Sequence, residues 1–330
     1  MGHGLSGLLL VTPRARVRRV LRPGAPSPLA GRTVLVTGAS SGIGEATALA
    51  VAGRGATVLL LARRTGELAR VRQVIVEAGG RAFVYPCDLT DGPAVDEVVA
   101  RVLVEHGVVD YLVNDAGRSI RRSLSLTHGR FHDFERMMAV NYFGAVRLTM
   151  GLLPAMRAQR SGHVVNVTSW GVQAKLPKFA AYLPSKVALD TWARIAGRET
   201  YADRVTFTNI RFGLVLTPMV MAAGSTEGRH SLTAEQAGER VVRALEDRPL
   251  TMGTTAGRTF ELVNLLAPRL SDAWASRMHR GSPDSVAARG AGAARPGTIS
   301  RLGPAPLPGT RPRWGRRSSR AARTACPRAR

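Results

Sequence analysis

Cysteine is almost absent from this sequence, which has Cys87 and Cys326 and no others among its 330 residues. The two lie far apart, and neither belongs to a CxxC motif or a Cys/His cluster. A disulfide framework and a structural zinc site both need more cysteines, more closely spaced. The scarcity argues for a reducing compartment and for a protein without a metal site.

Long hydrophobic runs are also missing. No segment approaches the roughly 20 apolar residues that a membrane-spanning helix needs. The run Leu8–Val11 is too short for the core of a signal peptide, and its arginines follow it instead of preceding it. We therefore expect a cytoplasmic protein.

Acidic residues are scarce, 23 against 47 lysines and arginines, and the formal net charge is +24. The imbalance lies mainly at the two ends, with six arginines in residues 1–32, eleven in residues 285–330, and no acid in either. Such segments bury too little apolar surface to fold. We expect residues 1–30 to form a flexible basic extension and residues 288–330 a disordered Arg/Pro/Gly/Ala-rich tail.

Arginine-rich tails attract polyanions and anionic membranes without specificity. The C-terminal tail has one aromatic residue, Trp314, and so lacks the stacking platform of single-strand binders. We expect no specific nucleic-acid partner. Peripheral membrane contact through the tails, and with it a membrane-associated location, stays open.

Short apolar runs alternate with amphipathic stretches from Thr33 onward, which indicates strand–helix units and a parallel sheet. The predicted strands are 33–37, 57–62, 81–86, 110–114, 163–168 and 205–212. The predicted helices are 43–54, 65–78, 92–106, 131–159, 180–201 and 233–247. Together they predict one α/β domain of the doubly wound Rossmann type over residues 31–287.

The end of this domain is less regular. After Pro249 we expect no strand that closes the sheet, because RPLTMGTTAG is a poor strand candidate. One further amphipathic helix is predicted from about Thr259 to His279, where leucines recur at helical spacing. These leucines are Leu262, Leu265, Leu266 and Leu270.

A glycine-rich segment, TGASSGIG, follows the first predicted strand and opens a helix. Gly38, Gly42 and Gly44 permit a tight turn, close approach of the backbone to a pyrophosphate, and close helix packing. The helix N-terminus attracts the anion. The strand before and the helix after are the context that a dinucleotide-binding loop requires.

The second predicted strand ends at Ala62 and is followed by Arg63 and Arg64. A site for NAD places a carboxylate here to hold the ribose 2′-hydroxyl, whereas an arginine accommodates the 2′-phosphate of NADP. The pattern favours NADP(H). A solvated arginine pair at a helix start is the alternative.

Tyr182 and Lys186 lie four residues apart in YLPSK, on one face of a predicted helix. A tyrosine with a pKa of about 10 is a poor acid–base group unless a nearby cation stabilises its phenolate, as Lys186 would. A plain surface pair is the alternative. Four further polar residues favour an active site over a surface pair, because all of them are expected at the carboxyl edge of the sheet, where such sheets bind ligands. They are Asp88, Asn114, Asn141 and Ser169.

This ordered set of motifs over about residues 31–250 resembles the short-chain dehydrogenase/reductase family. The resemblance implies that Tyr182 is the general acid or base, that Lys186 tunes it and binds the nicotinamide ribose, and that Ser169 orients the carbonyl. It implies that Asn141 holds a water of the proton relay. The cofactor residues it implies are Thr37, Gly38, Ser40, Ser41, Gly42, Ile43, Gly44, Arg63, Arg64, Asp88, Leu89, Asn114, Ala116, Gly117, Tyr182, Lys186 and Thr217.

Two positions depart from the family pattern. Asp115 replaces the second Asn of NNAG, which adds a charge at a position that stabilises the sheet. Phe212 replaces the proline of the usual PG after the sixth strand, so the wall of the nicotinamide pocket differs.

A narrower resemblance, carried by NDAGRSIRRS, AYLPSKVALD and the stretch LAPRLSDAW with SPDSVA, points to the bacterial long-chain fatty acyl-CoA reductases of this family. It implies reduction of an acyl thioester to an aldehyde. The cluster Arg118, Arg121 and Arg122 would meet an anionic coenzyme A, with a solvated surface as the alternative. An apolar channel for the acyl chain, against ordinary packing, is expected from Trp170, Leu176, Phe179, Met219, Val220 and Met221.

Three readings of function therefore stand beside one another. The first is an NADP(H)-dependent reductase of a lipid-like carbonyl, most simply a long-chain acyl-CoA. The second is an alcohol or ketone dehydrogenase with a bulky hydrophobic substrate. The third is a cofactor-binding or membrane-surface protein without turnover. In each case we expect a homo-oligomer.

Overall fold

The computed structural model describes residues 26–222, 231–282, 284 and 288. The predictions for most of the two basic tails lie outside these residues. The described packing begins before the predicted boundary at Gly31. Leu29 is fully buried in the core, and the Ser27 hydroxyl donates a 2.8 Å hydrogen bond to Glu246.

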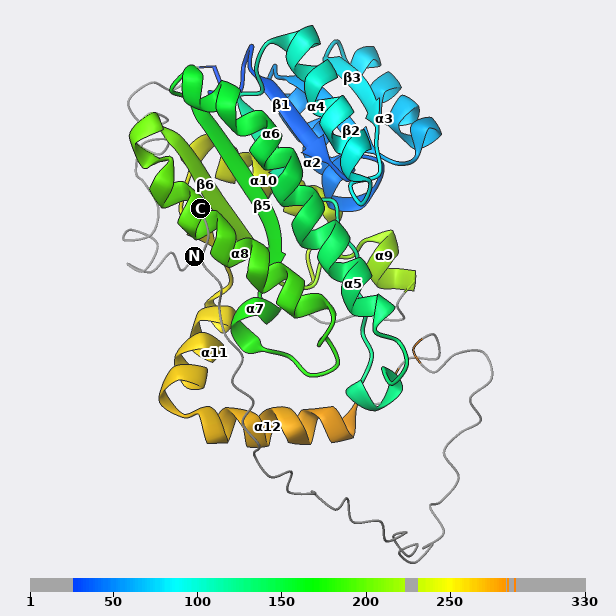
Figure 1. Cartoon of the computed structure of the whole chain (residues 1–330), viewed down its shortest axis with the longest axis vertical. Helices are drawn as coiled ribbons and strands as arrows, with labels where there is room; N and C mark the ends of the chain where they lie inside the picture. The colour runs from blue at the N-terminus through cyan, green and yellow to red at the C-terminus, as the bar shows by residue number, and fades with distance from the viewer. Residues whose placement is uncertain (1–25, 223–230, 283, 285–287, 289–330) are drawn as a thin grey trace, which may run out of the picture. The chain divides into compact units, whose positions relative to one another are not determined.

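A seven-stranded parallel sheet forms the centre of the fold, with the strand order β3-β2-β1-β4-β5-β6-β7 (Figure 1). The strands are β1 (Thr33–Thr37), β2 (Thr57–Ala62), β3 (Arg81–Pro86), β4 (Tyr111–Asn114), β5 (Gly162–Ser169), β6 (Val205–Phe212) and β7 (Thr251–Met252). The predicted α/β Rossmann architecture and its six strands are confirmed.

The expectation that no strand follows Pro249 was wrong. β7 has two residues and pairs with β6 through Asn209↔Thr251 and Ile210↔Met252. A strand this short has no alternation of its own for a sequence pattern to report. The two residues form a strand because their backbone pairs with β6.

Helices cover both faces of the sheet. They are α2 (Gly42–Ala52), α3 (Thr65–Glu77), α4 (Gly92–His106), α5 (His132–Met138), α6 (Gly144–Ala158), α7 (Gly171–Ala174), α8 (Tyr182–Glu199), α9 (Pro218–Ala222), α10 (Ala234–Asp247), α11 (Thr255–Leu266) and α12 (Pro268–Gly281). Along β1, Val34 and Val36 face the core under α2, α3 and α10, whereas Leu35 faces the core under α4, α6 and α8. Both faces of the strand are therefore buried, which is why its sequence is continuously apolar.

Two predicted helices are interrupted. The segment predicted as 131–159 contains a π-helical stretch, Ala139–Phe143, between α5 and α6. The single helix expected over 259–279 is instead two helices, α11 and α12, which meet at Ala267. Pro268 disfavours helical geometry at the residue before it and lacks an N–H, so it starts a new helix instead of continuing the old one (Figure 1).

Candidate active site

The carboxyl ends of β1 and β4 mark the point where the strand order reverses, the usual ligand crevice of an open parallel sheet. Thr37 joins the two strand ends: its hydroxyl donates to the Val113 carbonyl at 3.1 Å and accepts from the N–H groups of Asp115 and Ala116, each at 3.0 Å. These bonds hold the glycine-rich loop beside the NDAG segment.

Glycine is required at two positions of this loop. Gly38 has a φ of +71°, and a Cβ atom there would lie 3.0 Å from the backbone of Ala116. Gly42 has a φ of +61°, and its Cβ would lie 3.2 Å from the methyl group of Thr217. Side chains at either position would separate the loop from the segments that complete the crevice.

A cleft of about 850 Å³ runs along this edge. It brings together most of the predicted site residues, which are Gly38, Ser40, Ser41, Gly42, Ile43, Arg63, Arg64, Asp88, Leu89, Ala116, Gly117, Ser169, Tyr182, Lys186 and Thr217. Four predicted residues are not among its lining: Thr37, Gly44, Asn114 and Asn141. These residues lie next to the segments that line the cleft, and the side chains of Thr37, Asn114 and Asn141 hydrogen-bond to neighbouring segments.

Asn114 belongs to a ladder of buried amides across three strands. Its Nδ2 donates to Asn166 Oδ1 at 2.9 Å, and Asn166 Nδ2 donates to Asn209 Oδ1 at 3.2 Å. The three residues stand in register on β4, β5 and β6. Sequence reasoning missed Asn166 and Asn209, whose only signal was an asparagine inside each apolar strand.

Asn141 lies in the π-helical stretch and is fully buried. Its Oδ1 accepts from the Arg118 N–H at 2.9 Å, and its Nδ2 donates to the Arg118 carbonyl at 3.0 Å and to Ser185 Oγ at 2.9 Å. This side chain thereby links the segment after β4 to helix α8.

Tyr182 and Lys186 occupy the first turns of α8 and face the cleft. The Lys186 ammonium is buried and donates to the Val167 carbonyl at 2.9 Å. A Cβ on Gly117 would lie 3.2 Å from that nitrogen, so the segment after β4 packs directly on the lysine. Burial lowers the pKa of Lys186, and the nearby Asp115 carboxylate raises it.

Burial raises the pKa of Tyr182 to about 12, while the hydrogen bond with the Ser169 hydroxyl lowers it and the charge of Asp115 raises it. The expected lowering of this pKa by Lys186 is therefore not seen here. A phenol with so high a pKa keeps its proton at neutral pH, which is the form that donates a proton to an oxygen.

Asp115, the departure from the family pattern, is half-buried between the glycine-rich loop and Lys186. Burial raises the pKa of its carboxyl, against the lowering effects of the Lys186 charge and of the hydrogen bond that the Gly44 N–H donates to it. An aspartate at this position therefore introduces a titratable group beside Lys186.

The two arginines after β2 have different surroundings. Arg64 turns onto the glycine-rich loop, where its guanidinium donates to Ser40 Oγ at 3.1 Å and to Ser41 Oγ at 2.9 Å. The Arg63 side chain is 62% exposed and lies 3.5 Å from the Asp88 carboxylate. Both line the cleft, but Arg64 is the one held against the loop.

The far part of the cleft is apolar. Trp170, Leu176, Phe179, Met219 and Val220 line it, as expected, whereas Met221 is not among the lining residues. Arg118, Arg121 and Arg136 also line the cleft.

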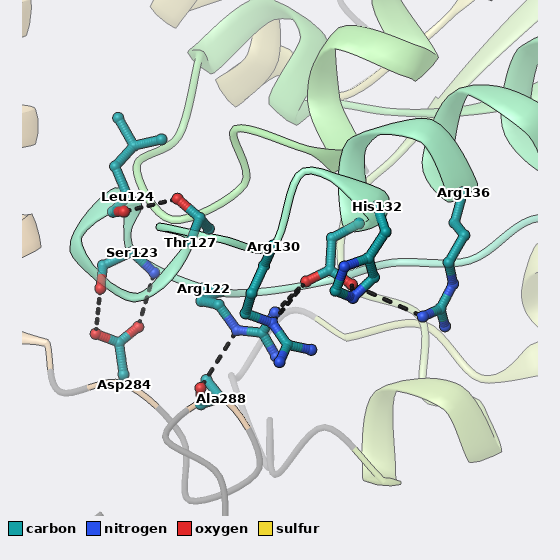
Figure 2. A network of polar contacts seen from close by, with 10 residues as sticks. Arg122, Ser123, Leu124, Thr127, Arg130, His132, Arg136, Asp284 and Ala288 are labelled. Carbon is teal, nitrogen blue, oxygen red and sulfur yellow. Dashed lines mark hydrogen bonds and ion pairs between the residues drawn. The ribbon is translucent and has the colours of Figure 1, made fainter.

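Arg122, in contrast, does not face a ligand, and the expectation that it would meet coenzyme A was wrong. It is ion-paired with the buried Asp133 and donates to the Ala288 carbonyl at 3.2 Å (Figure 2). Beside it, Asp284 accepts from the backbone N–H and the hydroxyl of Ser123 at 3.1 and 2.8 Å. Contacts between residues about 160 positions apart left no local signal in the sequence.

Residues 32–228 match the family model of the short chain dehydrogenases. The chain belongs to this family. It is 40% identical over 260 residues to a fatty acyl-CoA reductase of Acinetobacter baylyi, which covers 79% of this chain and 88% of the other. It is 38% identical over 253 residues to a fatty acyl-CoA reductase of Mycobacterium tuberculosis, covering 76% and 86%.

A solved structure with the same fold is the 3-oxoacyl-(acyl-carrier-protein) reductase of Agrobacterium tumefaciens with NADP bound. It is 27% identical, has a TM-score of 0.64, and covers 71% of this chain and 97% of its own. As a member of the short-chain dehydrogenase family, the chain is an oxidoreductase that uses a nicotinamide cofactor.

Two absences apply to the described part of the chain. No group of His, Cys, Asp and Glu side chains within it is arranged to hold a metal ion. None of its helices combines the length and the apolar character needed to cross a bilayer.

Proposed function

We propose that this oxidoreductase uses NADP(H) to reduce a lipid-like carbonyl, with a long-chain fatty acyl-CoA as the substrate and an aldehyde as the product. The observation that carries the proposal is a single cleft that is lined by the glycine-rich loop, by Tyr182 and Lys186, and by apolar side chains such as Trp170 and Phe179. The names of the two fatty acyl-CoA reductases support the substrate class.

The residues present fit an NADP molecule. The glycine-rich loop lines the cleft where α2 begins, and a helix N-terminus suits a pyrophosphate. The Arg64 guanidinium beside Ser40 and Ser41 supplies a cation for a 2′-phosphate. The NADP bound to the Agrobacterium tumefaciens reductase supports this choice of cofactor.

The chemistry divides between cofactor and protein. The bound nicotinamide supplies a hydride to the carbonyl carbon. Tyr182 gives its proton to the carbonyl oxygen, and Ser169, hydrogen-bonded to the phenol, orients that oxygen. Lys186, whose buried ammonium donates to the Val167 carbonyl, would hold the nicotinamide ribose, as the family resemblance implies. For a thioester, the product of the hydride and proton transfers is a hemithioacetal. Its hydroxyl returns the proton to the Tyr182 phenolate as the C=O bond re-forms and the C–S bond breaks, and the thiolate leaves and takes up a proton from water.

Oxidation of NADPH with a panel of acyl-CoAs, aldehydes and ketones tests this assignment. Each CH₂ buried in the apolar part of the cleft contributes up to about 0.8 kcal/mol, so four additional carbons should raise kcat/KM by about two orders of magnitude until the channel is filled. Turnover confined to a compact ketone would favour the alcohol/ketone dehydrogenase instead. No turnover with any carbonyl, despite cofactor binding, would favour a non-catalytic protein.

A further inference from the structure

The two last helices carry an exposed apolar surface that the reaction does not use. We call α11 and α12 together, residues 255–281, the C-terminal arm. Gly257 is the one buried residue of α11, and α12 has none. Three leucines around the junction of the helices are largely exposed: Leu265 at 76%, Leu266 at 73% and Leu270 at 72%.

Helical spacing makes this surface continuous along each helix. Leu270, Trp274 and Met278 recur every four residues and so lie on one face of α12. Leu262, Leu265 and Leu266 share one face at the end of α11. Only Ala267 to Arg269 separate the two sets. Exposed apolar residues grouped in this way mark an interaction surface.

A row of aromatic rings joins the arm to the cleft. Trp170 lines the cleft, Phe260 of α11 lies 5.8 Å from it between ring centroids, and Trp274 of α12 lies 5.1 Å from Phe260. Beyond the end of α12, Ser282 accepts a 2.6 Å hydrogen bond from Arg121, and its carbonyl accepts one from Lys178. The arm thus lies beside α7 (Figure 1), and the arm and the residue that follows it contact Trp170 and Arg121, which line the cleft.

The charges of the arm decide what kind of partner suits it. It has four arginines, Arg258, Arg269, Arg277 and Arg280, against Glu261 and Asp272. Glu261 is engaged within the protein, because it accepts from Gln173 at 2.5 Å and lies 3.6 Å from Arg211. The sequence that follows the arm has eleven arginines and no acid in residues 285–330. A second copy of this chain would bring like charges together, whereas anionic lipid headgroups are complementary.

We propose that the C-terminal arm docks the protein on an anionic lipid surface, with Leu265, Leu266 and Leu270 among the acyl chains. Docking places the arginines at the headgroups and the aromatic row at the edge of the bilayer, where long-chain substrates partition. The inference goes beyond the proposed reaction and does not depend on it, because vesicle binding is measured without cofactor or substrate.

The test is flotation of the full chain with phosphatidylcholine vesicles, with and without phosphatidylglycerol. We expect binding to the anionic vesicles and at least about a tenfold loss of the binding constant in the double variant Leu266→Gln/Leu270→Gln, since two leucines then no longer insert. Val76→Gln, which changes an exposed apolar residue of α3, is the matched control and should bind like the wild type. Circular dichroism and thermal unfolding of the double variant check that it is folded.

Three outcomes would overturn the proposal. One is that the wild type does not float with anionic vesicles. Another is equal binding by wild type and double variant, abolished by high salt, which would assign the interaction to the basic tail. The third is a wild-type oligomer that dissociates in the double variant without any vesicle binding, which would make the arm an interface between copies.

Trp274 gives a second readout of insertion. In a Trp314→Phe background, lipids with brominated acyl chains should quench tryptophan fluorescence of the full chain, and Trp274→Phe should remove most of that quenching. Quenching unchanged by Trp274→Phe would show that the arm does not enter the bilayer.

Discussion

The side-chain amide of Asn141 bonds to both the N–H and the carbonyl of Arg118, at 2.9 and 3.0 Å. The side chain of Asn141 thus satisfies both backbone hydrogen-bonding groups of Arg118, as a neighbouring strand would do in a sheet. Because Gly117 packs against the Lys186 ammonium, the position of this backbone segment bears directly on Lys186.

Asn141→Ala should lower both stability and turnover. It leaves the Arg118 backbone groups without their buried partner, at a cost of about 1–3 kcal/mol in the free energy of unfolding. We also expect kcat to fall at least about tenfold, because the Gly117–Lys186 contact loosens. Urea unfolding and NADPH oxidation measure the two effects. Gln73→Ala, which removes an exposed hydrogen bond to Glu77, is the control, and an Asn141 variant no worse than this control would refute the role.

Tyr182→Phe should abolish turnover and leave cofactor binding nearly intact, because the ring remains and the transferable proton is gone. Lys186→Ala should impair both, since the resemblance assigns it to the nicotinamide ribose as well. Steady-state rates and fluorescence titration with NADPH separate the two variants. Turnover by the Tyr182 variant within about tenfold of the wild type would disprove the assignment.

Arg64→Ala should weaken NADPH binding and leave NADH binding unchanged. A charge-assisted arginine–phosphate bond contributes about 1.5–3 kcal/mol, which corresponds to about tenfold or more in Kd. Arg63→Ala, at the arginine that is ion-paired with Asp88, should have the smaller effect. Equal Kd values for NADPH and NADH in the wild type would show that neither arginine reads the 2′-phosphate.

Asp115→Asn should change the pH dependence of stability. The pKa of Asp115 is raised in the folded protein, so the folded state holds a proton that the unfolded state loses above about pH 4. Between that pH and the raised folded value, this group lowers the stability of the wild type as pH rises. We expect the stability of the variant, relative to the wild type, to be higher at pH 7.5 than at pH 4. An equal difference at both pH values, from chemical denaturation, would rule out titration of Asp115 as the cause.

Much of the fold and part of the site follow from the sequence alone. Buried parallel strands such as TVLLLA are continuously apolar, and the glycines of the loop after β1 meet local backbone requirements, so both can be recognised over short windows. Tyr182 and Lys186 share a helix face because of their four-residue spacing. These features depend on residues within a few positions of one another.

Tertiary structure decided the rest. β7 exists because β6 offers backbone groups to two residues that have no pattern of their own. Arg64 hydrogen-bonds to Ser40, which precedes it by 24 positions in the sequence. Arg122 pairs with Asp133 and donates to the Ala288 carbonyl, although the three residues are not neighbours in the sequence. A local pattern reports which residues prefer burial or a helix, but the partner that satisfies a charge or a backbone N–H is selected only when the chain has folded.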